Sequence, residues 1–431
     1  MTSEHLESID PGRWPGVARV PLGTAARIRA RRAEARFADA CAKAGLSLDP
    51  AGSPDLVVEH EELFARLGAS GWLGLAESFM AGEWRADDLS SVLRALVSAG
   101  YRPAVGARPR VEPGDYQGAE LPAELVKFSS GDQVTFAAGA FSSGVPTTVR
   151  TAVESFVRGA GHGDEPARHF VDVTEHSAPV DVARPDLGPA QRGALELLLD
   201  AVDCHPGTHL LEYPGTGSTL AVAAAERRAT VDTLTADRAH LEATVEQLTL
   251  AGVRDSVATE LIDSAVPVGW RGRYDAVVSV ERYEQLSARD RPAFLTAVDH
   301  LLAPGGRLAM QTVVATDNTT ATARRALDPL RAYLWPALDY PLLTDLYRRF
   351  DRGSALRVLA ERHLGSHLGE TLRLQEETFA AHHREAAAEG FDAVFRRLWR
   401  YQFALRRALV DLGMLDLVQL TAVHRHRRGR R

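Results

Sequence analysis

The sequence contains little cysteine and no long apolar run. Only two of its 431 residues, Cys41 and Cys204, are cysteines, and they lie far apart without a CxxC spacing. This argues against a disulfide framework or a thiolate metal site and predicts a reducing compartment. No run of about 18 apolar residues is present, as a membrane-spanning helix would need. The N-terminus, MTSEHLESIDPGRWPG, lacks the basic-then-apolar pattern of a secretory signal, so we expect a cytoplasmic protein.

The chain also lacks an excess of positive charge. Its formal net charge is −7, which gives no indication of a nucleic-acid partner. Basic residues are nevertheless clustered in RIRARRAEAR (27–36) and in the tail HRHRRGRR (424–431). Such clusters suit an anionic membrane surface, which predicts a peripheral location at the inner face of the membrane. The alternative is a solvated helix face and a frayed tail.

The first part of the chain reads as mainly helical. Apolar residues at helical spacing predict helices over 20–46, 60–69 and 87–100. Several prolines and glycines in 100–125 mark a linker. We therefore expect an N-terminal domain over residues 1–125 that faces lipid or membrane.

The rest of the chain divides into two further segments. Residues 126–185 are expected to be a linker and acyl-site segment, with a helix at 147–158. From 186 to 431 helices and strands alternate, which predicts a parallel sheet with helices on both faces and a helical insertion at about 320–410. The expected strands of this α/β domain are 208–213, 229–235, 257–263, 274–280, 307–315 and 415–424.

A glycine turn follows the first of these strands, in LLEYPGTGSTLAVAAAE (210–226). Backbone N–H groups at a helix N-terminus favour anionic ligands, and glycine lets a ligand approach closely. The third glycine of a dinucleotide fingerprint is Leu220, so an NAD site is disfavoured. Asp232 and Asp237 bracket the position of a ribose-binding acid, and Asp263 ends the third strand, where it would accept from an adenine amino group.

Four segments together resemble the cyclopropane-fatty-acid synthase family, which includes mycolic-acid methyltransferases and belongs to the class I S-adenosylmethionine (SAM)-dependent methyltransferases. The segment LAESFMAGEWRADDLSSVLRAL (75–96) resembles the N-terminal signature of that family. The resemblance continues in DLGPAQRGALELLLDAVDCHPGTHLLE (186–212), RYDAVVSVERYEQL (273–286) and FRRLWRYQFALRRALVDLGMLDLVQLTAVH (395–424). It implies a Rossmann-like sheet and a lipid-binding N-terminal domain.

The resemblance also implies a reaction and a site. Members of the family transfer the methyl group of SAM to a double bond of a phospholipid acyl chain, and a bicarbonate ion accepts the proton. The implied catalytic residues are Glu284, Gln311 and His176. The implied cofactor-binding residues are Glu212, Gly215, Gly217, Thr235, Asp263 and Glu281. No metal is expected, because histidines 162, 169, 363, 367, 382 and 383 show no ligand spacing.

The sequence departs from the family at both parts of this site. The glycine positions of the family's cofactor turn are occupied by Pro214, Thr216 and Ser218, which predicts weaker SAM binding. The family's anion pocket contains a cysteine, a histidine on a strand, a tyrosine and a glutamate. This sequence has Ala178 in place of the cysteine, Gln311 in place of the histidine and about Leu368 in place of the tyrosine, and it retains the glutamate as Glu284. Most of the pocket side chains are therefore missing.

Two principal functions follow from this pattern. The first is an active lipid methyltransferase with an altered proton acceptor, which we favour. The second is a catalytically impaired paralogue that binds lipid or supports an active subunit, alone or in a homo- or hetero-oligomer with a related methyltransferase. Methylation of another small molecule is a third reading, disfavoured by the lipid-family N-terminal domain. The lipid and its product remain open.

Overall fold

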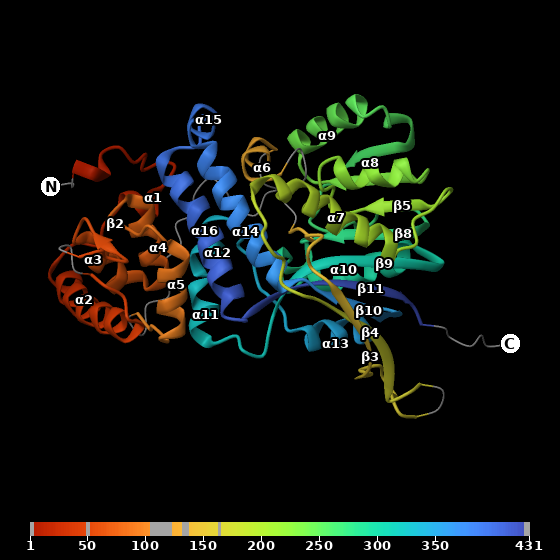
Figure 1. The fold of residues 1–431 in the computed structure, drawn as a ribbon, viewed down its shortest axis with the longest axis horizontal. Helices are drawn as coiled ribbons and strands as arrows, with labels where there is room; N and C mark the ends of the chain where they lie inside the picture. Colours follow the sequence, from red (N-terminus) through yellow and green to blue (C-terminus); the bar gives the residue numbers. More distant parts are fainter. Residues whose placement is uncertain (1–3, 49–51, 104–122, 132–137, 163–164, 426–431) are drawn as a thin grey trace. The chain divides into compact units, whose positions relative to one another are not determined.

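A computed structural model describes residues 4–48, 52–103, 123–131, 138–162 and 165–425 (Figure 1). The chain separates into two compact units. Unit 1 comprises Met1–Ala119, Asn318–Leu338 and Phe379–Met414, and unit 2 comprises Glu120–Asp317, Asp339–Thr378 and Leu415–Arg431. Each unit is thus assembled from segments that lie far apart in the sequence.

Unit 2 is organised around one sheet. Within the described residues the sheet has nine strands in the order β3-β4-β10-β11-β9-β8-β5-β6-β7. The strands are β3 (Pro146–Glu154), β4 (Arg168–His176), β5 (His209–Glu212), β6 (Thr230–Thr235), β7 (Val257–Leu261), β8 (Tyr274–Val280), β9 (Leu302–Ala315), β10 (Leu356–His363) and β11 (Leu415–His424).

The pairing directions divide the sheet into a parallel half and a mixed half. Strands β7, β6, β5, β8 and β9 are all parallel to their neighbours in this part of the sheet. Strand β11 pairs antiparallel with both β9 and β10, while β10 is parallel to β4. The carboxyl ends of β4, β10, β9, β8, β5 and β6 consequently lie along the same edge, where open α/β sheets bind ligands.

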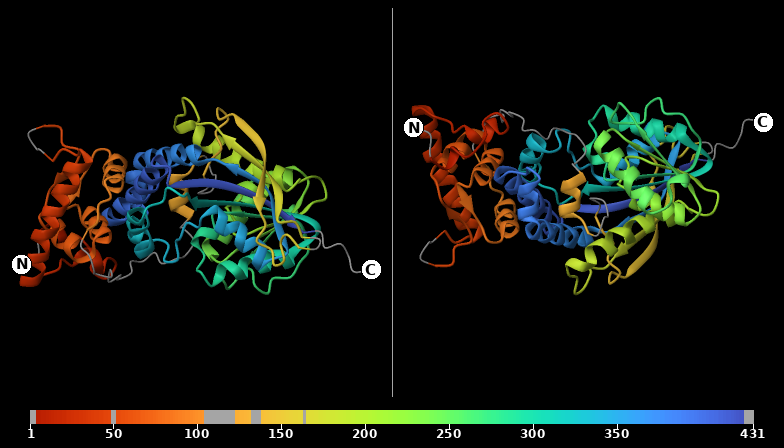
Figure 2. Two further views of the ribbon diagram at one scale, coloured as in Figure 1. Left: turned by 90° about the horizontal axis from the view of Figure 1, so that it is seen from below. Right: turned by 90° about the horizontal axis from the view of Figure 1, so that it is seen from above.

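Helices cover both faces of this sheet (Figure 2). The helices of unit 2 are α6 (Ala123–Ser129), α7 (Leu187–Ala201), α8 (Thr219–Glu226), α9 (Arg238–Leu250), α10 (Asp290–Leu301), α13 (Leu343–Gly353) and most of α14 (Gly365–Ala381). Leu210 packs in a core with α7 and α8, whereas Leu211, the next residue of β5, packs in a second core with α10 and α13. This alternation is the two-residue period of a strand buried on both faces. The expected Rossmann-like class is confirmed.

Three strands of the sheet were not expected. The helix predicted over 147–158 is wrong, because Pro146–Glu154 is strand β3, paired antiparallel along its length with β4. Residues 126–185, expected to be a linker and acyl-site segment, thus supply two strands. Strand β10 lies inside the expected helical insertion. Strand β3 is mostly exposed, so its apolar residues carry no clear burial pattern.

Unit 1 is mainly helical. Its helices are η1 (Glu4–Leu6), α1 (Pro15–Ala18), α2 (Thr24–Ala44), α3 (Glu62–Ser70), α4 (Trp72–Ala81), α5 (Leu89–Ser98), α11 (Ala321–Ala326), α12 (Asp328–Tyr333), α15 (His383–Ala388) and α16 (Ala393–Asp411). Among its described residues, the short strands β1 (Val57–Val58) and β2 (Trp84–Arg85) form an antiparallel ribbon.

The family-like signature in residues 75–96 has a structural role in unit 1. Gly82 ends α4 with a φ of 83°, a conformation that favours glycine. The buried Trp84 donates from Nε1 to the carbonyl of Leu75 and to Ser78 Oγ, each at 3.0 Å. Glu77 accepts a hydrogen bond of 2.7 Å from the hydroxyl of Tyr333. These contacts hold α4 in place.

A buried ion pair lies beside this signature. Arg66 donates from Nε to both carboxylate oxygens of Glu83, at 2.9 and 3.0 Å, and both side chains are almost fully buried. The guanidinium also donates to the carbonyls of Gly16, Val17 and Arg19 around α1. Burial raises the pKa of Glu83 to about 7, although the charge of Arg66 opposes that rise.

Two sequence features are located by the structure. Cys41 and Cys204 are both buried free thiols. Within the part of the chain that the structure describes, no helix has the length and apolar character needed to cross a membrane. Of the basic tail, His424 and Arg425 are described, and 426–431 lie outside the described residues.

Candidate functional site

The turn after β5 lies at the carboxyl edge of the sheet. Glu212, the last residue of β5, is fully buried, and its carboxylate accepts hydrogen bonds from the backbone N–H (2.8 Å) and the hydroxyl of Thr216. Burial raises the pKa of Glu212 to about 7, while the hydrogen bonds from Thr216 oppose the rise. Thr216, one of the residues in a family glycine position, therefore stabilises this turn internally.

Gly215 and Gly217 occupy positions that favour glycine, the first for lack of space and the second for its backbone conformation. The N–H of Gly215 donates to the carbonyl of Leu234 at 2.7 Å, and a Cβ at Gly215 would lie 2.7 Å from Oγ1 of Thr233. Gly217 has a φ of 91°. The two displaced glycines thus allow the turn to lie against β6. Ser218, the N-cap residue of the following helix α8, makes no side-chain cap hydrogen bond, so this helix end suits an anionic ligand.

The acids near β6 have different surroundings. Asp237 accepts hydrogen bonds from the N–H groups of Ala239 and His240 and thereby caps α9. Asp232 lies within β6 and accepts a hydrogen bond of 2.7 Å from the hydroxyl of Tyr274. Asp237 therefore caps α9 and Asp232 is a partner of Tyr274, while ribose binding by either carboxylate stays a prediction.

Thr235 and Asp263 lie at or beyond the ends of neighbouring strands. Thr235 is the last residue of β6; it is buried, and its hydroxyl accepts a hydrogen bond of 3.1 Å from the N–H of Asp237. Asp263 follows β7 and is exposed. A carboxylate at this position remains accessible to a ligand at the edge of the sheet.

Glu284 follows β8 and reaches across to β9. Its carboxylate accepts hydrogen bonds from the hydroxyl of Thr312 at 2.7 Å and from the N–H of Val313 at 3.3 Å. The side chain is buried, and burial, together with the negative charge of Glu281, raises its pKa to about 7. Both partners belong to the neighbouring strand, so this carboxylate links the turn after β8 to β9.

Glu281 is joined to Gln311 in the same region. One carboxylate oxygen of Glu281 accepts from Nε2 of Gln311 at 3.1 Å and from the N–H of Ala138 at 2.7 Å. The oxygen of the Gln311 amide accepts from Nε2 of Gln419 at 2.9 Å, so its orientation is set from β11. Glu281 has a φ of 47°, an unfavourable value for a residue with a Cβ, and such values concentrate at functional sites.

His176 lies elsewhere on this edge, at the end of β4. Its ring contacts that of His367 edge-on, with centroids 5.6 Å apart, and His367 Nδ1 accepts from the N–H of Phe141 at 2.9 Å. Burial, with the positive charge of Arg362 and the neighbouring His367, lowers the pKa of His176 to about 4. His176 is consequently a neutral imidazole at pH 7.

The structure therefore distributes the expected residues along the carboxyl edge of the sheet, with Thr235 at the end of β6 and Asp263 just after β7. Glu281, Glu284 and Gln311 lie together between β8 and β9. Glu212, Gly215 and Gly217 form the turn after β5, and His176 lies at β4, separated from β9 in the sheet order by β10 and β11. Sequence reasoning missed Thr312, Gln419 and His367, which orient these groups. Their polar side chains in apolar stretches were the available signal.

Comparison with known proteins gives a consistent picture. A family model described as mycolic acid cyclopropane synthetase matches residues 177–420. Tuberculostearic acid methyltransferase UfaA1 of Mycobacterium tuberculosis is 27% identical over 433 residues, which cover 96% of this chain and 96% of the relative. The match to this relative therefore includes the N-terminal part that lies outside the family model.

Solved structures with a similar fold include the cyclopropane synthase MmaA2 from Mycobacterium tuberculosis, with a TM-score of 0.51 and 20% identity over 57% of this chain and 88% of that one. The apo-form of mycolic acid cyclopropane synthase CmaA1 has a TM-score of 0.51 and 17% identity over 70% of this chain and 99% of that one. Coclaurine N-methyltransferase bound to N-methylheliamine and SAH has a TM-score of 0.52 and 14% identity, over 70% and 79% of the two chains.

Proposed function

Because the chain belongs to the mycolic acid cyclopropane synthetase family, a family of SAM-dependent methyltransferases, we propose that it transfers a methyl group from SAM to a carbon–carbon double bond of an acyl chain. The π electrons form the new C–C bond as the C–S bond of the sulfonium breaks, which leaves a carbocation on the acyl chain. A base then removes a proton from this cation. Loss of this proton gives a cyclopropane, a methylene group or a methyl-branched alkene, and none of these products needs a reductant.

The observation that carries this proposal is the pair of carboxylates between β8 and β9. Glu284 is buried and held by Thr312, and Glu281 is held by Gln311. Negative charge fixed in a site with little water stabilises a transient cation more strongly than it would in solution. With a pKa of about 7, Glu284 is also suited to accept a proton near neutral pH.

These carboxylates do not favour a bound bicarbonate. The amide of Gln311, which stands where the family has an anion-binding histidine, already donates to Glu281. A further anion beside Glu281 and Glu284 would be repelled by like charge. We therefore assign proton acceptance to this carboxylate pair, and no step requires bicarbonate.

SAM supplies the methyl group, and the turn after β5 would hold it. Gly215 and Gly217 allow close approach to the backbone, the N-terminus of α8 favours the carboxylate of its methionine part, and Asp263 is accessible to its adenine amino group. Thr216 is hydrogen-bonded to Glu212, and its side chain occupies space that a glycine would leave open to the ligand. We therefore expect SAM to bind more weakly than it would to a turn made of glycines.

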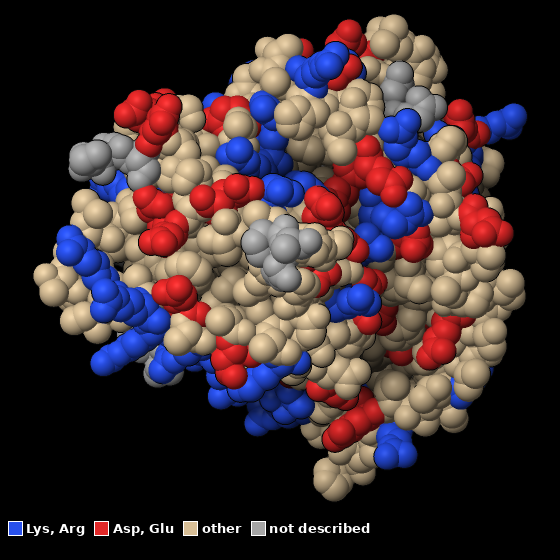
Figure 3. Space-filling model, turned by 60° about the vertical axis from the view of Figure 1, so that its left-hand side comes forward, with Lys and Arg blue, Asp and Glu red and all other residues tan. Residues whose placement is uncertain are grey.

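The acyl chain is proposed to belong to a phospholipid at an anionic membrane surface. Two similar proteins are named after long acyl chains. They are a tuberculostearic acid methyltransferase and a mycolic acid cyclopropane synthase. Helix α2 of unit 1 exposes five arginines, Arg27, Arg29, Arg31, Arg32 and Arg36. Figure 3 shows a string of basic side chains at the lower left of the viewed face. Together these features support peripheral binding at the inner face of the membrane.

The second candidate function is a non-catalytic partner of an active family member. It is favoured by one observation, that Pro214, Thr216 and Ser218 stand in the glycine positions of the cofactor turn. Such a subunit would keep the fold and bind lipid, in an oligomer with a related methyltransferase, without binding SAM.

Calorimetric titration of the full chain with SAM tests the proposal first. Weak but saturable binding is expected. If millimolar SAM produces no heat of binding and no shift of the melting temperature, the partner function is supported instead. The second measurement is transfer of labelled methyl from SAM into vesicles of monounsaturated phosphatidylglycerol. Transfer by the chain alone supports the enzyme, whereas stimulation only of an added active relative supports the partner.

A further inference from the structure

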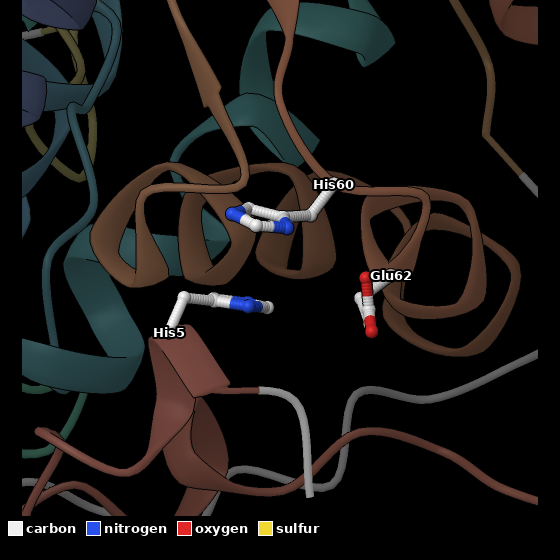
Figure 4. Close-up of side chains that lie close together, drawn as sticks. All are labelled: His5, His60 and Glu62. Carbon is white, nitrogen blue, oxygen red and sulfur yellow. The ribbon is translucent and has the colours of Figure 1, made fainter.

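A cluster of two imidazoles and a carboxylate lies in unit 1, whereas the proposed methyl-transfer residues belong to unit 2. It consists of His5 in η1, His60 in the turn before α3, and Glu62, the first residue of α3. One ligand atom of each residue lies within 4.8 Å of those of the other two. Figure 4 shows the two rings face to face with the Glu62 side chain beside them. Histidine spacing does not reveal this cluster, because His5 and His60 are distant in sequence.

The backbone around His60 is held by several independent contacts. The N–H groups of Glu59 and His60 both donate to the carbonyl of Glu83, at 2.8 and 3.0 Å. Val58 pairs with Trp84 in the β1–β2 ribbon. The Glu83 side chain is in turn fixed by Arg66. The position of His60 is thus determined by the fold, as a ligand-binding residue requires.

His5 is held against His60 without a hydrogen bond from its Nε2. The two ring centroids are 3.8 Å apart and the rings are nearly parallel, at 13°. Within the described residues the buried Nε2 of His5 has no hydrogen-bond partner, and a carboxylate oxygen of Glu83 lies 3.5 Å away. A buried polar atom without a partner carries a free-energy cost, and a bound ligand would remove it.

The cluster lies among charges of both signs. Glu62 and Glu83 contribute two carboxylates, and Arg66 and Arg397 contribute two guanidiniums. The guanidinium of Arg66 is committed to Glu83, and that of Arg397 donates to the carbonyl of Met80. A ring nitrogen with a free lone pair is what a metal ion binds, and the buried Nε2 of His5 has no hydrogen-bond partner among the described residues.

We propose that His5, His60 and Glu62 bind a divalent transition-metal ion, with Zn²⁺ as the best match. Two imidazole nitrogens and one carboxylate oxygen form a common zinc donor set, and a water completes the tetrahedron. Since stacked rings direct their lone pairs in parallel, binding rotates the rings apart until both nitrogens lie about 2.0–2.1 Å from one ion. Glu83, beside His5, then lies in the outer coordination sphere, where its carboxylate accepts a hydrogen bond from a ligand of the ion. The ion links the N-terminal segment to the start of α3.

The test is titration of the metal-free full chain with Zn²⁺, followed by calorimetry, and with Co²⁺, followed by its visible absorption. Wild type is expected to bind one ion tightly and to show the intense bands of tetrahedral Co²⁺. His60→Gln and Glu62→Gln are each expected to weaken Zn²⁺ binding by more than about tenfold. His300→Gln is the matched control, because His300 is exposed on α10 of unit 2.

Circular dichroism of each variant separates loss of the site from loss of folding. A folded His60→Gln variant with wild-type Zn²⁺ affinity would overturn the proposal, as would absence of zinc binding in the wild type. Zinc protection of residues near Leu6 from proteolysis, lost in folded Glu62→Gln, would support the link between η1 and α3.

Discussion

At the scale of single residues, Glu284 combines burial, two hydrogen bonds from β9 and a raised pKa. If it accepts the proton or stabilises the cation, Glu284→Gln should lower turnover by a factor of about 10²–10⁴. The measurement is labelled methyl transfer into monounsaturated phospholipid under saturating SAM. Glu260→Gln is the control, because Glu260 is exposed on β7. Turnover that survives Glu284→Gln unchanged would refute the role.

A second prediction concerns the buried pair of Arg66 and Glu83. Arg66→Leu leaves the Glu83 carboxylate without its partner, which should lower the free energy of unfolding by about 3–5 kcal/mol at pH 8. The loss should be smaller below pH 7, since Glu83 then takes up a proton. Urea denaturation at both pH values measures this. The double variant Arg66→Leu with Glu83→Leu should recover stability; an equally unstable double variant would argue for lost packing instead.

Individual site residues could be predicted from the sequence only where they belong to a segment that resembles the family. Glu284 and Gln311 could be located by resemblance, because each lies in or beside a recognisable strand. The contact of Glu281 with the N–H of Ala138 joins residues 143 positions apart, and no local pattern encodes it. The cluster of His5 with His60 was missed for the same reason. Such pairs are created by tertiary packing.

At the scale of elements, α2 is a basic helix with exposed apolar residues. Leu22, just before it, is 86% exposed and Ile28 is 51% exposed. Each arginine near an anionic leaflet contributes about 1 kcal/mol, or about fivefold in binding. Replacing Arg27, Arg31 and Arg32 with Gln should therefore weaken binding to phosphatidylglycerol vesicles about a hundredfold.

Vesicle co-sedimentation at low and high salt is the appropriate measurement, because salt screens exposed charges. The control variant carries Gln at Arg238, Arg271 and Arg289, which are exposed in unit 2. It removes the same charge from the chain and should bind like wild type. Equal weakening by both variants would mean that net charge, and not α2, determines binding.

The elements themselves were predictable to different degrees. Strands β5 to β8 follow short apolar runs between helical segments, so their positions agree with expectation. Strand β10 was missed because LRVLAERH stands among helical segments and alternates poorly. Strand β3 has few buried residues, and its pairing with β4 is what makes it a strand. Local pattern predicts buried parallel strands well and exposed edge strands poorly.

At the scale of the whole molecule, a histidine between two acids should make the folded protein lose stability as the pH becomes alkaline. His363 contacts Asp416 at 2.6 Å and Glu361 at 3.3 Å. Burial opposes protonation of His363, but these hydrogen bonds outweigh it and raise its pKa from 6.5 to about 10. The stabilisation is thus complete below pH 6.5 and is lost as pH rises toward about 10.

The difference in melting temperature between wild type and His363→Gln should accordingly be largest near pH 6 and narrow toward pH 10. Thermal unfolding across this range, in buffers of equal ionic strength, measures it. His300→Gln, an exposed histidine variant, should show no such trend. A difference that is constant with pH would show that the ion pairs of His363 contribute nothing.

The place of β11 in the sheet has a consequence for how the chain is made. This strand, Leu415–His424, joins β9 to β10, and unit 1 likewise needs residues up to Met414. Until residues 415–424 have left the ribosome, β9 and β10 have open edges that invite wrong pairing. Neither unit is complete before the segment that carries Met414 and β11 has emerged. A premature stop codon before Leu415 would therefore leave the parallel strands without their link to β10 and β4, however late in the message it falls.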